Sequence, residues 1–148
     1  HDWSMTSDNA RYSVMFELNE SGMPVAIRSL TYTIDCESLK SGHAALDRNA
    51  YSTLNTDDFK RITFTLTEGK VIEDRISCNG LLTIAGNTKA VDIVGHYKLQ
   101  SNGTLSCTAS KALKMSEFGI DPPVFMFGTI RTGDEITINF EVTLAQRQ

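Results

Sequence analysis

Polar and apolar residues alternate along most of the chain, a pattern typical of strands with one face buried and the other in water. The clearest case lies near the C-terminus, where Ile136, Ile138, Phe140, Val142 and Leu144 alternate with polar residues. A similar set near the N-terminus comprises Tyr12, Val14, Phe16 and Leu18. The same reasoning predicts further strands at Ile62 to Leu66, Val71 to Cys78, Leu81 to Ala85, Val91 to Leu99 and Thr104 to Lys114.

The extended run from Val25 to Cys36 changes parity part of the way along. Val25 and Ile27 share one face, whereas Leu30, Tyr32 and Ile34 follow the opposite count. Such a change within one strand predicts a β-bulge near Arg28-Ser29, and a bulge lets a sheet curl. The pattern therefore favours a barrel or a sharply bent sheet.

Two stretches interrupt the alternation. Leu46, Ala50 and Leu54 recur at every fourth position, which predicts a short amphipathic helix from about His43 to Asn55. The segment 115–128 is irregular and carries Pro122-Pro123, which cannot pair as a central strand. We therefore predict an all-β fold, an antiparallel β-barrel of about eight strands with one short helix. A chain of 148 residues fits a single domain, 1–148.

The run Gly80-Leu81-Leu82-Thr83-Ile84-Ala85-Gly86-Asn87-Thr88-Lys89-Ala90-Val91 is similar to the GxLTIxGxTKxV hairpin of the YceI-like family. Other pieces of that family occur in the expected order: Thr31 to Leu39, Asp58-Phe59, Ile62 to Phe64, Met115 to Ile120 and Thr132 to Ile138. The resemblance implies a lipocalin-like barrel, periplasmic or secreted, that binds an isoprenoid or another long apolar lipid inside. Asn87 stands where this hairpin commonly has an apolar residue.

The details most resemble the short variant of the family. Its features here are Pro122-Pro123, Met126, Phe127 and Gly128 in the closing loop, and His1-Asp2-Trp3 near the start. In that variant another strand usually precedes the His-Asp-Trp motif. The resemblance therefore implies a YceI-like domain that lacks a first N-terminal strand and has an unpaired edge.

Charge and cysteine usage exclude several classes of function. A net charge of -4, with 14 basic residues scattered among 18 acidic ones, provides no basic face, so we expect no nucleic-acid partner. No apolar run approaches the roughly 20 residues of a membrane helix, so we expect no membrane span. Cys36, Cys78 and Cys107 lie far apart without CxxC spacing, which indicates buried thiols rather than a metal site.

The histidines give no support for catalysis. His1, His43 and His96 belong to no recognisable nucleophile, metal or acid-base pattern, so we expect no enzyme, no catalytic residue, no metal and no cofactor. Lys111 shares the parity of Cys107 and Ala109, which would point it inward toward a ligand head group if no bulge intervenes. A bulge or a strand end at the barrel rim is the favoured interpretation, because unpaired buried lysines are rare.

A barrel of about eight strands either fills its interior with side chains or leaves room for one small ligand. A dry void of ~300 Å³ would cost roughly 7 kcal/mol, so an apolar cavity is expected to take up lipid or to be plugged. Gly95, Cys107 and Ala109 are small residues on inward faces and are expected to leave space. The inward parities give the candidate lining residues Leu30, Tyr32, Ile34, Phe64, Ile84, Ile93, Tyr97, Ile138 and Phe140. Of these, Tyr32 and Tyr97 are the best polar anchors for a head group.

Phe118, Phe125, Met126 and Phe127 crowd the irregular loop. They act either as a lid over the barrel entrance, which makes Phe118, Phe125 and Phe127 candidate ligand contacts, or as a plug at one end. For the helix, the plug is the favoured interpretation.

Three hypotheses follow, and the one ranked last is an enzyme for an apolar substrate, for which Lys111 is the only interior candidate. The first is a protein that binds an apolar lipid, such as an isoprenoid, a quinone or a fatty-acid-like molecule, as a carrier or sensor. The alternative is a structural or interaction module with a filled barrel and no ligand, in which an edge strand or the 115–128 loop docks a partner. Pairing of exposed edges would then produce a homodimer.

Overall fold

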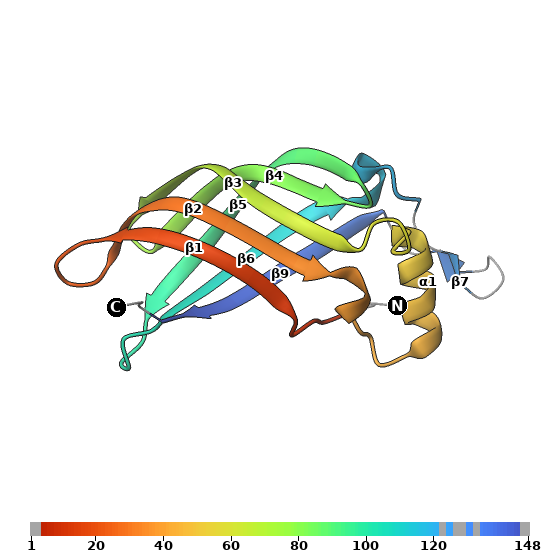
Figure 1. Cartoon of the computed structure of the whole chain (residues 1–148), viewed down its shortest axis with the longest axis horizontal. Helices are drawn as coiled ribbons and strands as arrows, with labels where there is room; N and C mark the ends of the chain where they lie inside the picture. The colour runs from red at the N-terminus through yellow and green to blue at the C-terminus, as the bar shows by residue number, and fades with distance from the viewer. Residues whose placement is uncertain (1–3, 122–123, 126–129, 132–133, 146–148) are drawn as a thin grey trace.

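The computed structural model describes the backbone of residues 4–121, 124–125, 130–131 and 134–145, and the side chains of 4–121 and 134–145. In these residues the fold is all-β, with one large curled antiparallel sheet and one α-helix (Figure 1). The large sheet holds seven strands: β1 (Ala10–Leu18), β2 (Pro24–Asp35), β3 (Arg61–Ile72), β4 (Arg75–Ile84), β5 (Asn87–Leu99), β6 (Leu105–Lys114) and β9 (Glu135–Leu144). The remaining elements are η1 (Cys36–Ser38), α1 (Ala44–Leu54), η2 (Met115–Phe118) and the two-stranded pair β7 (Val124–Phe125) and β8 (Ile130–Arg131).

The strands of the large sheet lie in the order β1-β2-β3-β4-β5-β6-β9. Within the described residues β1 and β9 are its edges, so the sheet forms a half-barrel. The predicted all-β, lipocalin-like fold with one short helix is therefore confirmed, with seven strands in its main sheet. The motif His1-Asp2-Trp3 and the residues Pro122-Pro123, Met126, Phe127 and Gly128 lie outside the described residues.

The bulge predicted in the second strand is confirmed. Met15 pairs with Ser29 and Phe16 with Ile27, so Arg28 is an extra residue in β2. Two further extra residues occur: Val25 in β2, between the partners of Glu17 and Leu18, and Thr67 in β3, between the partners of Gly80 and Asn79. Each extra residue bends its strand and increases the local twist, which lets the sheet wrap around its apolar face.

The prediction that one strand ends at Cys78 and the next begins at Leu81 is wrong. The strand β4 runs without interruption through Gly80, and the chain reverses earlier, at Glu73-Asp74. Gly80 provides close packing, because a Cβ atom there would lie 2.5 Å from both the Thr65 carbonyl oxygen and the Phe64 Cζ. The actual turn is fixed by Tyr97, whose hydroxyl donates to the Glu73 carbonyl at 2.7 Å.

The next reversal joins β4 to β5 through a two-residue turn. Ala85 and Gly86 have φ values of 51° and 78°, the combination of a type I′ turn, whose twist matches that of the flanking strands. Asn87 follows directly, and its side-chain amide donates to the carbonyl oxygen of Phe118 at 2.5 Å. The hairpin is thereby attached to η2.

The helix predicted from about His43 to Asn55 is confirmed as α1, with His43 and Asn55 as its caps. It lies at one end of the curled sheet, and η2 is found at the same end (Figure 1). Leu46 is buried, and Leu54 packs against the core. This placement is that of a plug, the interpretation favoured from the sequence.

The helix end of the sheet is filled by a cluster that we call the plug cluster: Ile84, Leu113, Met115, Phe118 and Ile120, all at most 7% exposed. The start of β9 holds η2 in place. The Asp134 carboxylate accepts hydrogen bonds from the backbone N–H of Ser116 at 2.8 Å and from its hydroxyl at 2.5 Å. These bonds lower the pKa of Asp134, so the carboxylate stays ionised and the attachment persists at neutral pH.

Candidate functional site

An apolar cavity of about 110 Å³ lies inside the curl of the sheet. All seven strands contribute to its wall, and the lining atoms are almost entirely apolar. The lining residues are Tyr12, Val14, Phe16, Ile27, Leu30, Tyr32, Phe64, Ile76, Cys78, Ile93, Gly95, His96, Cys107, Thr108, Ala109, Phe140, Val142 and Leu144.

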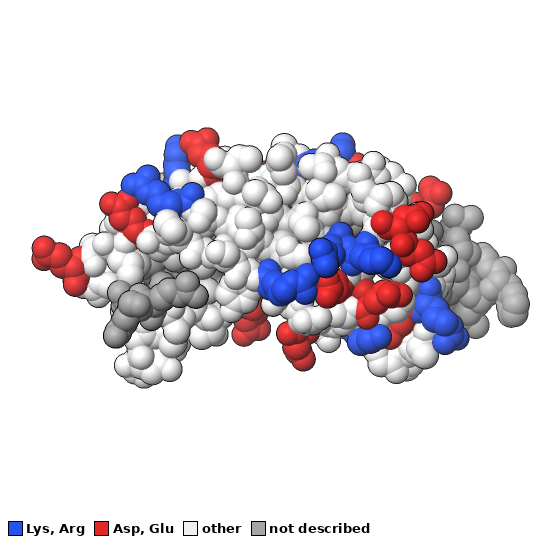
Figure 2. Space-filling view, viewed as in Figure 1, with Lys and Arg blue, Asp and Glu red and all other residues white. Residues whose placement is uncertain are grey.

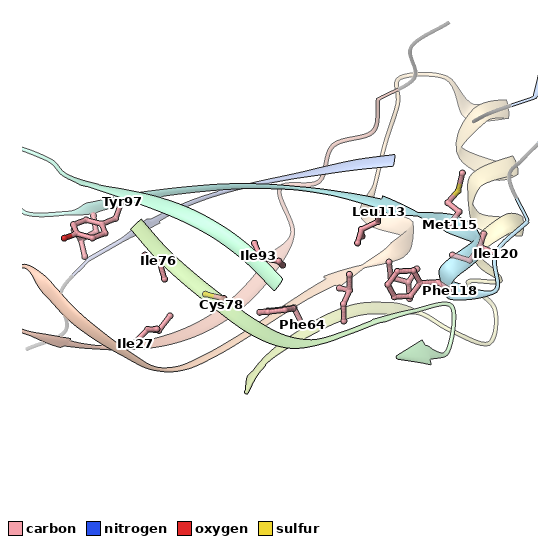
Figure 3. Packing of buried hydrophobic residues seen from close by; sticks show 13 residues of the cluster. Ile27, Phe64, Ile76, Cys78, Ile93, Tyr97, Leu113, Met115, Phe118 and Ile120 are labelled. Atoms are coloured by element: carbon pink, nitrogen blue, oxygen red, sulfur yellow. The ribbon is translucent and has the colours of Figure 1, made fainter. Parts of the chain in front are cut away.

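The cavity occupies the half of the curl away from α1. Figure 3 shows this division, with Phe64 between two groups of residues: Ile27, Ile76, Cys78 and Tyr97 toward one end, and Leu113, Met115, Phe118 and Ile120 toward the other. The second group belongs to the plug end, where the side chains are closely packed. The cavity therefore lies among the core residues of one end, whereas the helix end is filled by the plug cluster.

Five of the residues predicted to bind ligand line this cavity: Leu30, Tyr32, Phe64, Ile93 and Phe140. The small residues Gly95, Cys107 and Ala109, which were expected to leave space, also line it.

The other predicted contacts lie elsewhere. Ile84 and Phe118 are buried in the plug cluster, while Ile34 and Ile138 lie one inward position closer to the helix end than the lining residues Tyr32 and Phe140. Tyr97 is buried near the Glu73-Asp74 turn, outside the lining. For Phe118 the structure favours the plug over the lid. The side chains of Phe125 and Phe127 lie outside the described residues.

Several lining residues were not among the predicted contacts: Tyr12, Val14, Phe16, Ile27, Ile76, Cys78, Val142 and Leu144. The signal for most of them was present, because the sets in β1 and β9 alternate in the same way as the strands from which candidates were drawn. The alternation does not show which part of each strand borders the cavity and which part borders the plug cluster.

An aromatic group joins the two edges of the sheet across the cavity. The Tyr12 and Tyr32 rings are stacked with centroids 6.1 Å apart, and the Tyr32 ring meets Phe140 edge-on at 5.2 Å. The Tyr12 hydroxyl donates to the Thr143 carbonyl oxygen at 3.2 Å, which links β1 to β9. Burial raises the pKa of Tyr32, and nearby Tyr12 raises it further, so this phenol stays neutral.

The expected polar anchors differ in availability. The Tyr97 hydroxyl is already used by the Glu73 carbonyl, and it lies outside the cavity lining. The predicted rim place of Lys111 is wrong: it lies within β6 in unbroken register with Ile138 of β9, so it keeps the inward parity of Ala109. Its amine lies 3.5 Å from the Asp92 carboxylate, and its side chain is 26% exposed. Tyr32 is therefore the better placed of the two predicted tyrosines.

Charges of both signs lie side by side on the face drawn in Figure 2. Asp35, for example, is bridged by Arg11 at 3.0 Å and by Arg61 at 3.4 Å. Within the part of the chain that the structure describes, no cluster of three or more histidine, cysteine or acidic side chains could hold a metal ion. In the same residues no helix is long and apolar enough to cross a membrane.

The three thiols are free, as the sequence indicated. Cys36 and Cys78 are buried, and Cys107 is half-buried. Burial raises the pKa of all three, that of Cys78 to about 11. Since Cys78 and Cys107 line the cavity, their reactivity reports on access to it.

We expect Cys78 in the native protein to react with a thiol reagent at pH 8 about 100-fold more slowly than an ordinary thiol, because a pKa of about 11 in place of 9.0 leaves that much less thiolate. Timed alkylation followed by peptide mass spectrometry measures the rate. In urea the three thiols should react alike. Equal rates for Cys78 in native and unfolded protein would contradict its buried position.

Three comparisons place the chain among known proteins. A family model described as the YceI-like domain matches residues 5–144. A search of curated protein sequences finds no significant match. Among solved structures, the YceI protein of Campylobacter jejuni superposes with a TM-score of 0.76 at 17% sequence identity, covering 100% of this chain and 87% of its own.

Two further solved structures share the fold. BcnA of Burkholderia cenocepacia has a TM-score of 0.74 at 17% identity, covering 96% of this chain and 93% of its own. A polyisoprenoid binding domain from Saccharophagus degradans, implicated in plant cell wall breakdown, has a TM-score of 0.63 at 9% identity, with coverages of 95% and 96%. Because the family model spans nearly the whole sequence and these neighbours have the same curled sheet, the chain belongs to the YceI-like family.

Proposed function

We propose that the protein binds an apolar small molecule in the cavity between its seven strands. The observation that carries this proposal is the apolar lining of a hollow of about 110 Å³ within an otherwise packed domain. If dry, a hollow of this size costs roughly 3 kcal/mol, at about 24 cal/mol per Å³. An apolar occupant would recover part of that cost through contacts with the wall.

The ligand class that fits best is an isoprenoid, a quinone or a fatty-acid-like molecule. Aliphatic and aromatic side chains dominate the wall, and its almost entirely apolar atoms suit hydrocarbon chains and rings. Two observations make His96 a poor interior acid or base: its side chain is 58% exposed, and it lies 3.9 Å from Asp74. The family relationship and the polyisoprenoid-binding neighbour support a binding role, as a carrier or sensor, over catalysis. Localisation in the periplasm or outside the cell is a further proposal, which follows from the family resemblance alone.

A second candidate role is supported by the edges of the sheet. Within the described residues, β1 and β9 have no strand partner on their outer sides, and exposed edges pair readily with other strands. A homodimer formed through these edges would appear in light scattering as a doubled mass that rises with concentration. This role is compatible with ligand binding.

Filling the cavity tests the main proposal. We expect Ala109→Phe to weaken binding of the apolar fluorescent probe N-phenyl-1-naphthylamine at least about tenfold, because the new ring occupies the space in which the phenyl ring of the probe would lie. Fluorescence titration measures the affinity. Native mass spectrometry of the freshly purified protein detects any co-purifying apolar mass.

The matched control is Ala112→Phe, the same change on the same strand at an exposed position. It should leave the affinity unchanged, and circular dichroism should show that both variants keep the fold. Ala109→Leu, a smaller addition, covers the case in which the phenylalanine variant does not fold. Equal binding by the Ala109 and Ala112 variants would show that the probe binds elsewhere and would remove the proposal.

A further inference from the structure

The cavity ends at a defined level along its length. On β2 the lining includes Leu30 and Tyr32 but not Ile34, and on β9 it includes Phe140 but not Ile138. The same boundary appears on the other strands, where the last lining residues toward the helix end are Tyr12 on β1, Phe64 on β3, Cys78 on β4, Ile93 on β5 and Ala109 on β6. The hollow therefore has a floor.

Phe64 is the only residue of β3 in the lining, and it is 4% exposed. Its ring crosses onto β4, where the absence of a side chain at Gly80 makes room for it: a Cβ there would lie 2.5 Å from Phe64 Cζ and 2.8 Å from Cε2. Thr65 follows Phe64 in the sequence, and Leu81 follows Gly80. Because Thr65 and Leu81 are paired between β3 and β4, the backbone beneath the Phe64 ring is held by the sheet. Phe64 is thus fixed at the floor.

Solid packing continues behind this floor. Leu82 and Ile84 are 2% and 3% exposed, and Phe118 is 1% exposed. In Figure 3 Phe64 lies between Cys78 and Ile76 on one side and Phe118 of the plug cluster on the other. A ligand that entered the hollow would meet the Phe64 ring before it met the plug cluster.

The volume above the floor is small. About 110 Å³ is somewhat less than the ~150 Å³ engineered cavity that accepts a benzene molecule. A single ring or a short branched chain fills such a space. A long chain would have to leave most of its length outside.

We propose that Phe64 is the residue that limits ligand depth, so that this protein binds a compact apolar group about the size of one ring or one to two five-carbon units, and not the buried length of a long polyisoprenoid. The group is either a small molecule or the end of a larger amphiphile. This proposal rests on the proposed function, since it specifies what the same cavity accepts.

The experiment measures displacement of N-phenyl-1-naphthylamine by the C5, C10, C15 and C20 isoprenoid alcohols below their solubility limits. Each buried methylene raises affinity about fourfold, so a fully buried five-carbon unit would raise it more than 100-fold. For the unmodified protein we expect a steep gain from C5 to C10 and less than about a threefold gain for each later unit.

Removing the floor should extend the binding site by about one unit. In Phe64→Ala we expect the C15 alcohol to gain at least tenfold over the C10 alcohol, with Phe64→Leu intermediate and usable if the alanine variant is too unstable. The matched control is Phe16→Ala, the same truncation in the cavity wall at the hairpin end of β1, which should change affinity for all chain lengths alike.

Two results would overturn the inference while leaving ligand binding intact: an unmodified protein whose affinity keeps rising more than tenfold per unit up to C20, or a length preference that Phe64→Ala and Phe64→Leu leave unchanged. Failure of the unmodified protein to bind the probe and every alcohol is a different outcome. It would remove the proposed function, and this inference with it.

Discussion

Replacing Phe118 with alanine is expected to lower the free energy of unfolding by about 3–5 kcal/mol, the range for deleting a fully buried aromatic ring. Phe118 is 1% exposed, and among the described residues it is the largest one whose side chain is fully buried. Because Asn87 and Asp134 hold η2 through the Phe118 carbonyl and through Ser116, the surrounding backbone cannot easily collapse into the space left by the ring. Urea denaturation followed by circular dichroism measures the change.

The comparison variant is Phe59→Ala, in which a ring that is 39% exposed is removed near the same end of the sheet. Its loss should be less than half as large, because much of the ring already contacts water. Similar losses for the two variants would show that η2 does not plug the half-barrel. The Phe118 variant should also bind the apolar probe like the unmodified protein while it remains folded, since Phe118 does not line the cavity.

Local patterns were sufficient to predict the helix, most of the strands and the curl of the sheet. The parity change between Ile27 and Leu30 located the bulge at Arg28. Ile27 and Leu30 can both point to the inner face only if the strand contains an extra residue between them. The four-residue spacing of Leu46, Ala50 and Leu54 located α1 to within one residue at each end. In both cases the cause lies within a dozen residues of sequence.

The β3–β4 hairpin was misplaced because its local signals pointed the wrong way. Asn79-Gly80 has the composition of a turn, whereas the real turn, at Glu73-Asp74, contains neither glycine nor proline. Glu73 adopts a φ of 55°, and its carbonyl is bound by Tyr97, which is 24 residues away in sequence. A tertiary contact therefore stabilises a turn that local propensity does not predict.

The depth of the cavity was equally inaccessible from sequence. Parity identifies which side chains point inward, so Ile34, Ile84 and Ile138 were as eligible as Tyr32 and Phe140. What separates the two groups is the position of η2 and α1, which fill one end of the curl. Asn87, a departure from the usual hairpin, has a role in that arrangement, because its amide binds the Phe118 carbonyl from β5.

Gly80→Ala is expected to destabilise the protein by about 3 kcal/mol, the upper part of the range for overpacking. The added Cβ would lie 2.5 Å from the Thr65 carbonyl oxygen, and a backbone atom within a paired sheet cannot give way without breaking the pairing. The Phe64 ring, which is also 2.5 Å away, would have to move into the cavity, so probe affinity should fall as well. Gly95→Ala is the matched control, because its Cβ would meet the Thr108 carbonyl oxygen at 3.1 Å and require only a small shift, costing about 1 kcal/mol or less. Urea denaturation of the two variants decides the point: if Gly80→Ala costs no more than Gly95→Ala, the Phe64 ring does not depend on Gly80 for its place at the floor.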